Sequence, residues 1–278
     1  MLSRNIKFKN FPKRTKSLVA NKSFRVLKND YINKKLKILQ SLSHDYKKSY
    51  TKKIVHKYKN FQNYKVIGIG GSILGPKAIY QFLEHKVRKN FFFVDNLQTT
   101  LNLQKKKKTV NLIISKSGNT LETISNSNIL IKNKKNIFIT ENKNNYLNIL
   151  ANRLKADIVE HKNYIGGRYS VLSEVGMLPA ELMGLNEKKF KKFNELIKNK
   201  SFTNSLIKNV IFINKYSLQG KKNSVILNYD EKSENLFKWY QQLIAESLGK
   251  KSKGIFPIIS TMPKDNHSLL QLYLDGPK

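Results

Sequence analysis

The sequence predicts an α/β protein with two doubly wound parallel-sheet domains, the second of them incomplete. From about residue 48, short apolar runs alternate with segments of helical periodicity, the pattern of a parallel sheet flanked by helices. The alternation partly repeats after about residue 166, and the chain stops within an apparent element at "LYLDGPK". A length of 278 residues allows two modest domains. We therefore expect a basic N-terminal arm at 1–47, a first domain at 48–165 and a second, incomplete domain at 166–278.

The arm is expected to be helical or irregular, with an amphipathic piece at 36–42. The first domain then begins with a buried strand, because "YKVIGI" is apolar and rich in β-branched residues. The predicted elements are strands at 64–69, 90–96, 109–115 and 136–142, and helices at 76–85 (opened by Pro76), 120–133 (N-cap Asn119, capping-box Glu122) and 145–154.

The second domain repeats the pattern less completely. Its strongest helix is "SENLFKWYQQLIAESLG" at 233–249, in which apolar residues recur at helical spacing. Three apolar runs read as strands, at 209–214, 224–229 and 254–260.

The charge balance is strongly basic, with 53 Lys and Arg against 18 Asp and Glu and a net charge of +35. Such a balance suggests a nucleic-acid partner. However, the basic residues are mostly lysines spread evenly among Asn and Ile, with runs such as 104–109 and 131–136 in expected loops. A biased background composition explains this pattern at least as well. We expect no specific nucleic-acid partner, and any binding would be non-specific and salt-sensitive.

Several classes of protein are excluded by composition. The chain has no cysteine, so it forms no disulfide, thiolate metal site or cysteine nucleophile. No apolar run is long enough to cross a bilayer, and residues 1–24 have no apolar core of a secretory signal. We therefore expect a cytoplasmic protein with no membrane partner. A mitochondrial transit peptide is the second interpretation of the basic start.

Two loops contain residue types that bind anions in other proteins. "VIGIGGSILGPKAI" (66–79) and "ISKSGNTLET" (114–123) each join a strand to a helix N-terminus. In the second loop, Gly118 lets backbone N–H groups turn inward and Lys116 adds a charge. Its hydroxyl donors are Ser115, Ser117 and Thr120. An ordinary polar turn with helix capping is the alternative, and two such loops at one sheet edge leave both interpretations open.

Two nucleotide motifs can be tested directly. A Walker A loop is excluded, because no Gly-Lys-Ser/Thr follows the glycines. The dinucleotide fingerprint begins with Gly68 and Gly70, but Ile73 stands at its third glycine position. Asp95 ends the next predicted strand, where a ribose-binding acid is expected. A nicotinamide enzyme therefore remains an alternative.

Candidate catalytic groups are scattered along the second half. Glu246 lies along the apolar face of the helix at 233–249, one turn after Gln242, so we expect it to be partly desolvated, as a general base is. The alternative is a glutamate at the edge of the apolar stripe that reaches solvent or pairs with Lys250. Arg168 follows two glycines, which is a compact anion-binding arrangement or equally a turn with a salt-bridged arginine. His267 follows a polar loop and can equally be an exposed loop histidine.

Taken together, the segments resemble the glucose-6-phosphate isomerase family. The resemblance covers roughly residues 60–278. Its five motifs occur in family order: "GIGGSILGP" (68–76), "SKSGNTLET" (115–123), "YIGGRYSVLSEVG" (164–176), "AESLGK" (245–250) and "DNHSLLQLYLDGP" (265–277).

This resemblance implies two sugar-isomerase (SIS) domains of flavodoxin-like type. It also implies the interconversion of glucose 6-phosphate and fructose 6-phosphate through a cis-enediol, in glycolysis and gluconeogenesis, with no metal or organic cofactor. The phosphosugar would be the small-molecule partner. The substrate-binding residues it implies are Ser115, Lys116, Ser117 and Thr120 for the phosphate, Gly71 and Ser72 in the sugar pocket, and Gln242 in contact with substrate.

The same resemblance assigns the catalytic groups. Glu246 would move the proton, Arg168 would stabilise the enediolate, and His267 would assist ring opening from the neighbouring subunit of a homodimer. Family members continue beyond the "DGP" match to a helix with a catalytic lysine, and this sequence stops at Lys278. We therefore expect a fragment or a degenerate form with weak or no turnover by itself. A non-catalytic SIS-type sugar-phosphate regulator is the main alternative.

Overall fold

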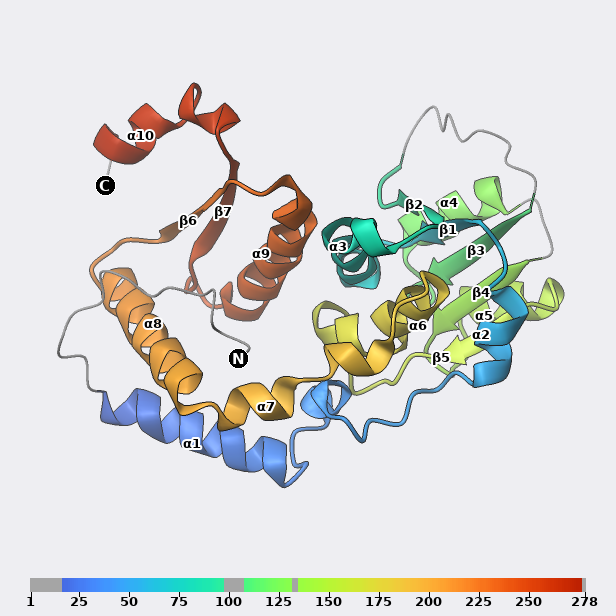
Figure 1. The fold of residues 1–278 in the computed structure, drawn as a ribbon, viewed down its shortest axis with the longest axis horizontal. Helices are drawn as coiled ribbons and strands as arrows, with labels where there is room; N and C mark the ends of the chain where they lie inside the picture. Colours follow the sequence, from blue (N-terminus) through green and yellow to red (C-terminus); the bar gives the residue numbers. More distant parts are fainter. Residues whose placement is uncertain (1–16, 98–107, 132–134, 277–278) are drawn as a thin grey trace.

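The structure, a computed structural model, describes residues 17–97, 108–131 and 135–276, and the statements below concern these residues. Two parallel sheets, one of five strands and one of two, lie in separate lobes (Figure 1). The predicted α/β class is confirmed, and the second sheet is the smaller one. Parts of the lysine runs at 104–109 and 131–136, like the expected arm before residue 17, lie outside the described residues.

The large sheet has the strand order β2-β1-β3-β4-β5, with every pair parallel. Its strands are β1 (Asn63–Ile67), β2 (Asn90–Val94), β3 (Thr109–Ile114), β4 (Asn136–Thr140) and β5 (Asp157–Glu160). Four of these strands were predicted, and β5 was not. The chain turns from β1 to β2 on one side and continues with β3 on the other, which is the flavodoxin-like order. Ligands bind such sheets beyond the carboxyl ends of the strands where the order reverses, here between β1 and β3.

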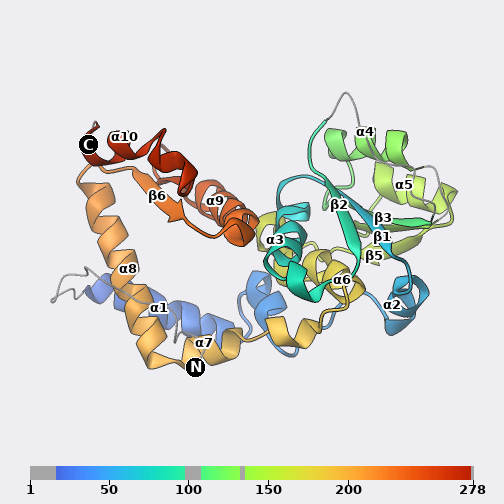
Figure 2. The ribbon, with the colours of Figure 1, turned by 45° about the horizontal axis from the view of Figure 1, so that its top comes forward.

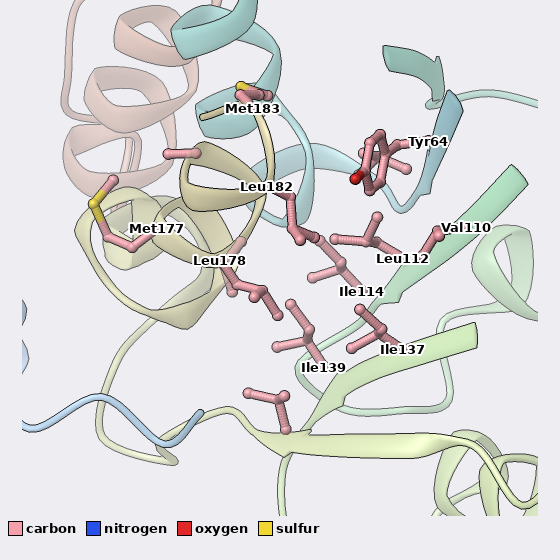
Figure 3. Packing of buried hydrophobic residues seen from close by; sticks show 14 of the residues in the cluster. Tyr64, Val110, Leu112, Ile114, Ile137, Ile139, Met177, Leu178, Leu182 and Met183 are labelled. Carbon is pink, nitrogen blue, oxygen red and sulfur yellow. The ribbon is translucent and has the colours of Figure 1, made fainter. Parts of the chain in front are cut away.

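Each face of this sheet buries its own apolar cluster, because successive side chains of a strand point to opposite faces. Leu112 and Ile114 of β3 face one cluster, together with Met177 and Leu178, while Ile113 faces the other (Figure 3). The helices on the first face are α2 (Lys52–Tyr58), α3 (Leu74–Phe82) and α6 (Glu174–Leu182). Those on the second face are α4 (Leu121–Leu130) and α5 (Tyr146–Arg153). Burial on both faces explains the nearly continuous apolar runs of the central strands.

The small sheet pairs β6 (Asn223–Asn228) with β7 (Phe256–Thr261), and α9 (Glu234–Leu248) connects them. These three elements confirm the predictions at 224–229, 254–260 and 233–249. Helix α9 packs against α3 of the other lobe (Figures 1 and 2). The Gln81 carboxamide of α3 stabilises this contact. It donates to the carbonyl oxygen of Glu231 and accepts from the side-chain amide of Asn235.

The strand predicted at 209–214 is wrong, because those residues form part of α8 (Lys200–Leu218). A short apolar run has no periodicity of its own, and "NVIFIN" is flanked by helix-compatible residues with no turn signal. The helix begins instead at Asn199, whose side chain caps it by accepting from the backbone N–H of Phe202 at 3.0 Å.

The described part of the arm is mainly helix α1 (Leu18–Ile32), followed by a 3-10 helix (Lys37–Leu42) where the amphipathic piece was expected. Tyr31 joins α1 to α7 (Phe193–Lys198) by donating to the Asn194 carboxamide oxygen at 2.6 Å. A short helix α10 (Leu270–Asp275) ends the described chain. Among the residues described, no helix has the length and apolarity needed to span a bilayer.

Candidate active site

The candidate site is a pocket of about 380 Å³ beyond the carboxyl ends of β1, β3 and β4. This is where the reversal of strand order predicts a ligand. The lining residues are Ile69, Gly71, Ser72, Lys116, Ser117, Thr120, Glu141, Lys143 and Gly167. The structure therefore brings together five of the residues that the sequence assigned to substrate binding, and it adds an acid and a lysine that were not predicted.

The loop after β3 is held in a fixed shape by its own hydroxyl groups. Ser115, buried behind the pocket, lies 2.8 Å from the Thr120 hydroxyl and accepts from the backbone N–H of Gly118 at 3.2 Å. Gly118 has a φ of +69°, and a Cβ there would lie 2.1 Å from the Asn145 carboxamide oxygen, so only glycine fits. The predicted cap is corrected here: Thr120 precedes α4, whereas the Asn119 side chain accepts from the backbone N–H of Tyr146. The loop is thereby tied to the start of α5.

The glycine loop after β1 touches the segment that carries Arg168. A Cβ on Gly71 would lie only 2.2 Å from the carbonyl carbon of Gly167, so the two backbones are in direct contact. The hydroxyl of Ser170 adds a bond to the carbonyl oxygen of Gly71 at 3.3 Å. This contact joins the pocket to the second group of candidate residues.

Arg168 and Glu246 form an ion pair of 2.7 Å between the guanidinium Nη1 and the carboxylate Oε1. The Gln242 carboxamide donates to the other oxygen of Glu246 at 3.2 Å, and it also lies against Gly70 of the glycine loop. Residues 78 positions apart in the sequence thus meet at the junction of the two lobes.

Three further side chains fix Arg168, and the sequence did not single them out for this. The Ser247 hydroxyl accepts from the guanidinium Nε at 2.8 Å and lies 2.8 Å from the Tyr169 hydroxyl. The Tyr169 ring also lies beneath the guanidinium. The Trp239 indole donates to the carbonyl oxygen of Arg168 at 3.0 Å. Motif segments around residues 169 and 247 were visible in the sequence, but their contact depends on the packing of α9.

The expected desolvation of Glu246 is not found. Its side chain is 51% exposed, and its partner is Arg168 rather than Lys250. The apolar stripe of α9 faces β7 and α3, whereas Glu246 lies in the last helical turn, where fewer elements cover it. The ion pair, not burial, defines the environment of this carboxylate.

His267 follows β7 and a short 3-10 helix (Lys264–Asn266). It is exposed, and within the described chain no hydrogen bond or ion pair joins its imidazole to Arg168, Gln242 or Glu246. Asp95, the candidate ribose acid, is paired with Lys77 at 2.7 Å. Across the described residues, no group of three or more His, Cys, Asp or Glu side chains is placed to hold a metal ion.

A larger cavity, of about 650 Å³, lies between the arm, α7 and the loop at 162–164. Its lining includes lysines and three tyrosines, but none of the predicted site residues. We therefore place the candidate site at the smaller pocket.

Comparison with known proteins agrees with this geometry. The family profile described as phosphoglucose isomerase matches residues 19–257, most of the chain. The chain belongs to the phosphoglucose isomerase family. A glucose-6-phosphate isomerase of Methanocaldococcus jannaschii is 38% identical over 252 residues, which are 80% of this chain and 60% of that one. One of Campylobacter jejuni is 33% identical over 240 residues, 78% of this chain and 58% of that one. The chain thus spans about three fifths of the length of these phosphoglucose isomerases.

Solved structures share the fold. A hypothetical protein of Thermus thermophilus superposes with a TM-score of 0.77 at 26% identity, over 93% of this chain and 68% of that one. A glucose-6-phosphate isomerase of Chlamydia trachomatis gives a TM-score of 0.67 at 21% identity, over 81% of this chain and 50% of that one. The second likeness concerns the phosphoglucose isomerase fold alone.

Proposed function

We propose that this protein interconverts glucose 6-phosphate and fructose 6-phosphate by proton transfer through a cis-enediol. The observation that carries the proposal is the Arg168–Glu246 pair, joined to an anion-binding pocket by the contact of Gly71 with Gly167. A base, a cation and a phosphate cradle are the parts that this reaction needs. The relatives of Methanocaldococcus jannaschii and Campylobacter jejuni are glucose-6-phosphate isomerases, which supports the same activity.

The phosphate would be held by the loop after β3. The hydroxyls of Ser117 and Thr120 and the ammonium of Lys116 line the pocket, and Ser115 holds the Thr120 hydroxyl in place. Gly71 and Ser72 would lie along the sugar. A dianion bound far from the reacting carbons supplies binding energy that orients C1 and C2.

Glu246 would take the proton from C2 of the open-chain aldose and return it to C1. The negative charge that develops on the enediolate oxygens needs nearby donors. Arg168 has five N–H donors, and the bonds to Glu246 and Ser247 use one each, so the others can face the enediolate. Gln242 would hold the second carboxylate oxygen and contact the substrate. Proton transfer of this kind needs no metal or organic cofactor.

His267 would assist ring opening in a second copy of the chain, within a homodimer. Its imidazole is exposed, and among the described residues no hydrogen bond joins it to Arg168 or Glu246 of the same chain, which supports this assignment. We further propose a cytoplasmic location and no specific nucleic-acid or membrane partner. The division into an arm at 1–47 and two SIS-type domains at 48–165 and 166–278 stays a prediction.

The test is Glu246→Gln, which keeps the size of the side chain and removes the base. Calorimetric binding of glucose 6-phosphate should survive, while isomerisation should fall by about 10²–10⁴-fold, the usual contribution of a general base. Glu234→Gln is the control, because Glu234 is an ion-paired glutamate at the other end of α9. Phosphosugar binding with no turnover in the unmodified protein is the result expected both of a sugar-phosphate regulator and of an incomplete isomerase. Turnover that survives Glu246→Gln would refute the assigned base.

A further inference from the structure

The pocket contains a carboxylate that the proposed reaction does not use. Glu141 directly follows β4 and lines the pocket with Lys116 and Lys143. One carboxylate oxygen of Glu141 lies 3.6 Å from the Lys116 ammonium, and the other lies 2.5 Å from the Lys143 ammonium. A single carboxylate therefore bridges both lysines of the lining.

The backbone around this bridge is fixed. The N–H of Glu141 donates to the carbonyl oxygen of Lys116 at 3.1 Å, which ties the end of β4 to the loop after β3. The Asn148 carboxamide donates to the carbonyl oxygens of Glu141 and Lys143, at 2.9 and 2.7 Å. The main chain of the bridge is thus held in place, and only its side chains are free to exchange partners.

The two lysines differ in how firmly they are held. The Lys116 ammonium also donates to the carbonyl oxygen of Asn163 at 2.7 Å, so it has a second fixed partner. Lys143 is half-exposed, and the bond to Glu141 is the ion pair that draws its ammonium to the pocket. Lys143 is therefore the more mobile of the two charges.

The Glu141 side chain is only 12% exposed. Burial alone would raise the pKa of this carboxyl, but the Lys143 and Lys116 ammoniums outweigh it and hold the pKa below its usual range. Glu141 is therefore ionised at neutral pH. A full negative charge thus lies in a pocket whose hydroxyls and lysines suit an anion.

We propose that the Glu141 carboxylate competes with a bound phosphate. It binds the same ammonium groups, of Lys116 and Lys143, that a dianionic phosphate would use. Lys143 is then a second phosphate-binding cation, which Glu141 restrains. The inference rests on the proposed assignment of this pocket to the phosphate end of a sugar. It makes Glu141 a residue that sets affinity, because it keeps phosphosugar binding weak enough for release.

The direction of the effect follows from the charges. Lys116, Lys143 and Glu141 leave the lining with a net charge of +1, and removing the carboxylate charge raises it to +2. A dianion is repelled by Glu141 and must also displace it from both lysines. Removing one unit charge at a partly exposed site changes the binding of a dianion by about tenfold.

The experiment is calorimetric titration of inorganic phosphate and of glucose 6-phosphate at pH 8 and low salt. Glu141→Gln should bind both ligands about tenfold more tightly. Lys143→Gln should bind them more weakly, and its effect should be larger in the Glu141→Gln background, where Lys143 is released. Glu195→Gln and Lys192→Gln are matched controls, because these residues form an ion pair at α7, outside the pocket, and should leave phosphate binding unchanged.

The outcomes decide whether Glu141 competes with phosphate or only holds Lys116 in position. Unchanged or weaker binding in Glu141→Gln would overturn the inference, since Glu141 would then merely hold Lys116 in position. Lys143→Gln tests it independently of how Glu141→Gln folds, and an unchanged affinity there would also overturn it. If the unmodified protein binds glucose 6-phosphate but Glu141→Gln does not differ, only this inference fails. If the unmodified protein binds neither ligand, the phosphate assignment of the proposed function fails with it.

Discussion

The contact between Gly71 and Gly167 gives a sharp prediction for Gly71→Ala. The new Cβ would lie 2.2 and 2.4 Å from the carbonyl carbon and oxygen of Gly167, and 2.5 Å from the backbone nitrogen of Arg168. Carbon atoms in contact are normally about 3.5–4.0 Å apart, so the two loops must separate by more than an ångström. All three neighbours are backbone atoms, so no side chain can rotate away. Overpacking of this kind costs about 1–3 kcal/mol.

Gly167→Ala is the matched control on the opposite side of the same contact. Its Cβ would lie 4.0 Å from the Cα of Gly71, an ordinary van der Waals distance. Thermal unfolding should place Gly71→Ala below the unmodified protein by about 2–4 °C for each kcal/mol lost, and leave Gly167→Ala nearly unchanged. Isomerisation should fall about 100-fold in Gly71→Ala, because an ångström-scale shift of Arg168 misplaces the reacting groups. Equal melting temperatures for the two variants would refute the geometry.

Two further predictions concern stability. Tyr46→Phe removes the hydroxyl that bonds both oxygens of the fully buried Glu174, at 2.9 Å each, so urea unfolding should show a loss of about 1.5–3 kcal/mol; an unchanged midpoint would contradict this role. Burial lowers the pKa of His161 below its ordinary 6.5, so the unfolded chain binds this proton first and the free energy of unfolding should fall as pH drops below about 6.5. His161→Gln should flatten that decline between pH 7 and 5.5 by up to about 1.4 kcal/mol per pH unit, and an unaltered decline would assign it to other groups.

The large sheet was predictable from sequence wherever a strand is buried on both faces. The run at 109–115 is mostly apolar because helices cover both sides of β3, and a short apolar run of this length is typical of a buried strand. Strand β5 is only four residues, "DIVE", with a single buried side chain, so its sequence carries too little pattern. At 209–214, by contrast, a strand was predicted where there is none. The residues of this run suit a strand, but those on both sides of it continue a helix.

Each loop of the site was predictable from the sequence, but the contacts between side chains of different loops were not. Glycines and hydroxyls directly after apolar strands indicated both loops, because such residues at a helix N-terminus suit an anion. The bridge from Glu141 to Lys116 depends on β4 lying beside β3, which local sequence does not encode. The exposure of Glu246 likewise depends on how α9 packs between the lobes. The spacing of apolar residues along the helix therefore predicted more burial of Glu246 than the structure has.

The central claim is proton transfer by Glu246 through an enediol, and hydrogen exchange tests it most directly. Fructose 6-phosphate incubated with the protein in D₂O should yield glucose 6-phosphate that carries deuterium at C2, detected by loss of the C2 proton signal in NMR spectra. Slow turnover suffices, because the label accumulates with time. Glu246→Gln should slow the appearance of both product and label by about 10²–10⁴-fold. Because one carboxylate can also return the proton that it removed, the label in the unmodified protein is the decisive positive result. Labelling at an unchanged rate in Glu246→Gln would assign the base elsewhere and would contradict the account.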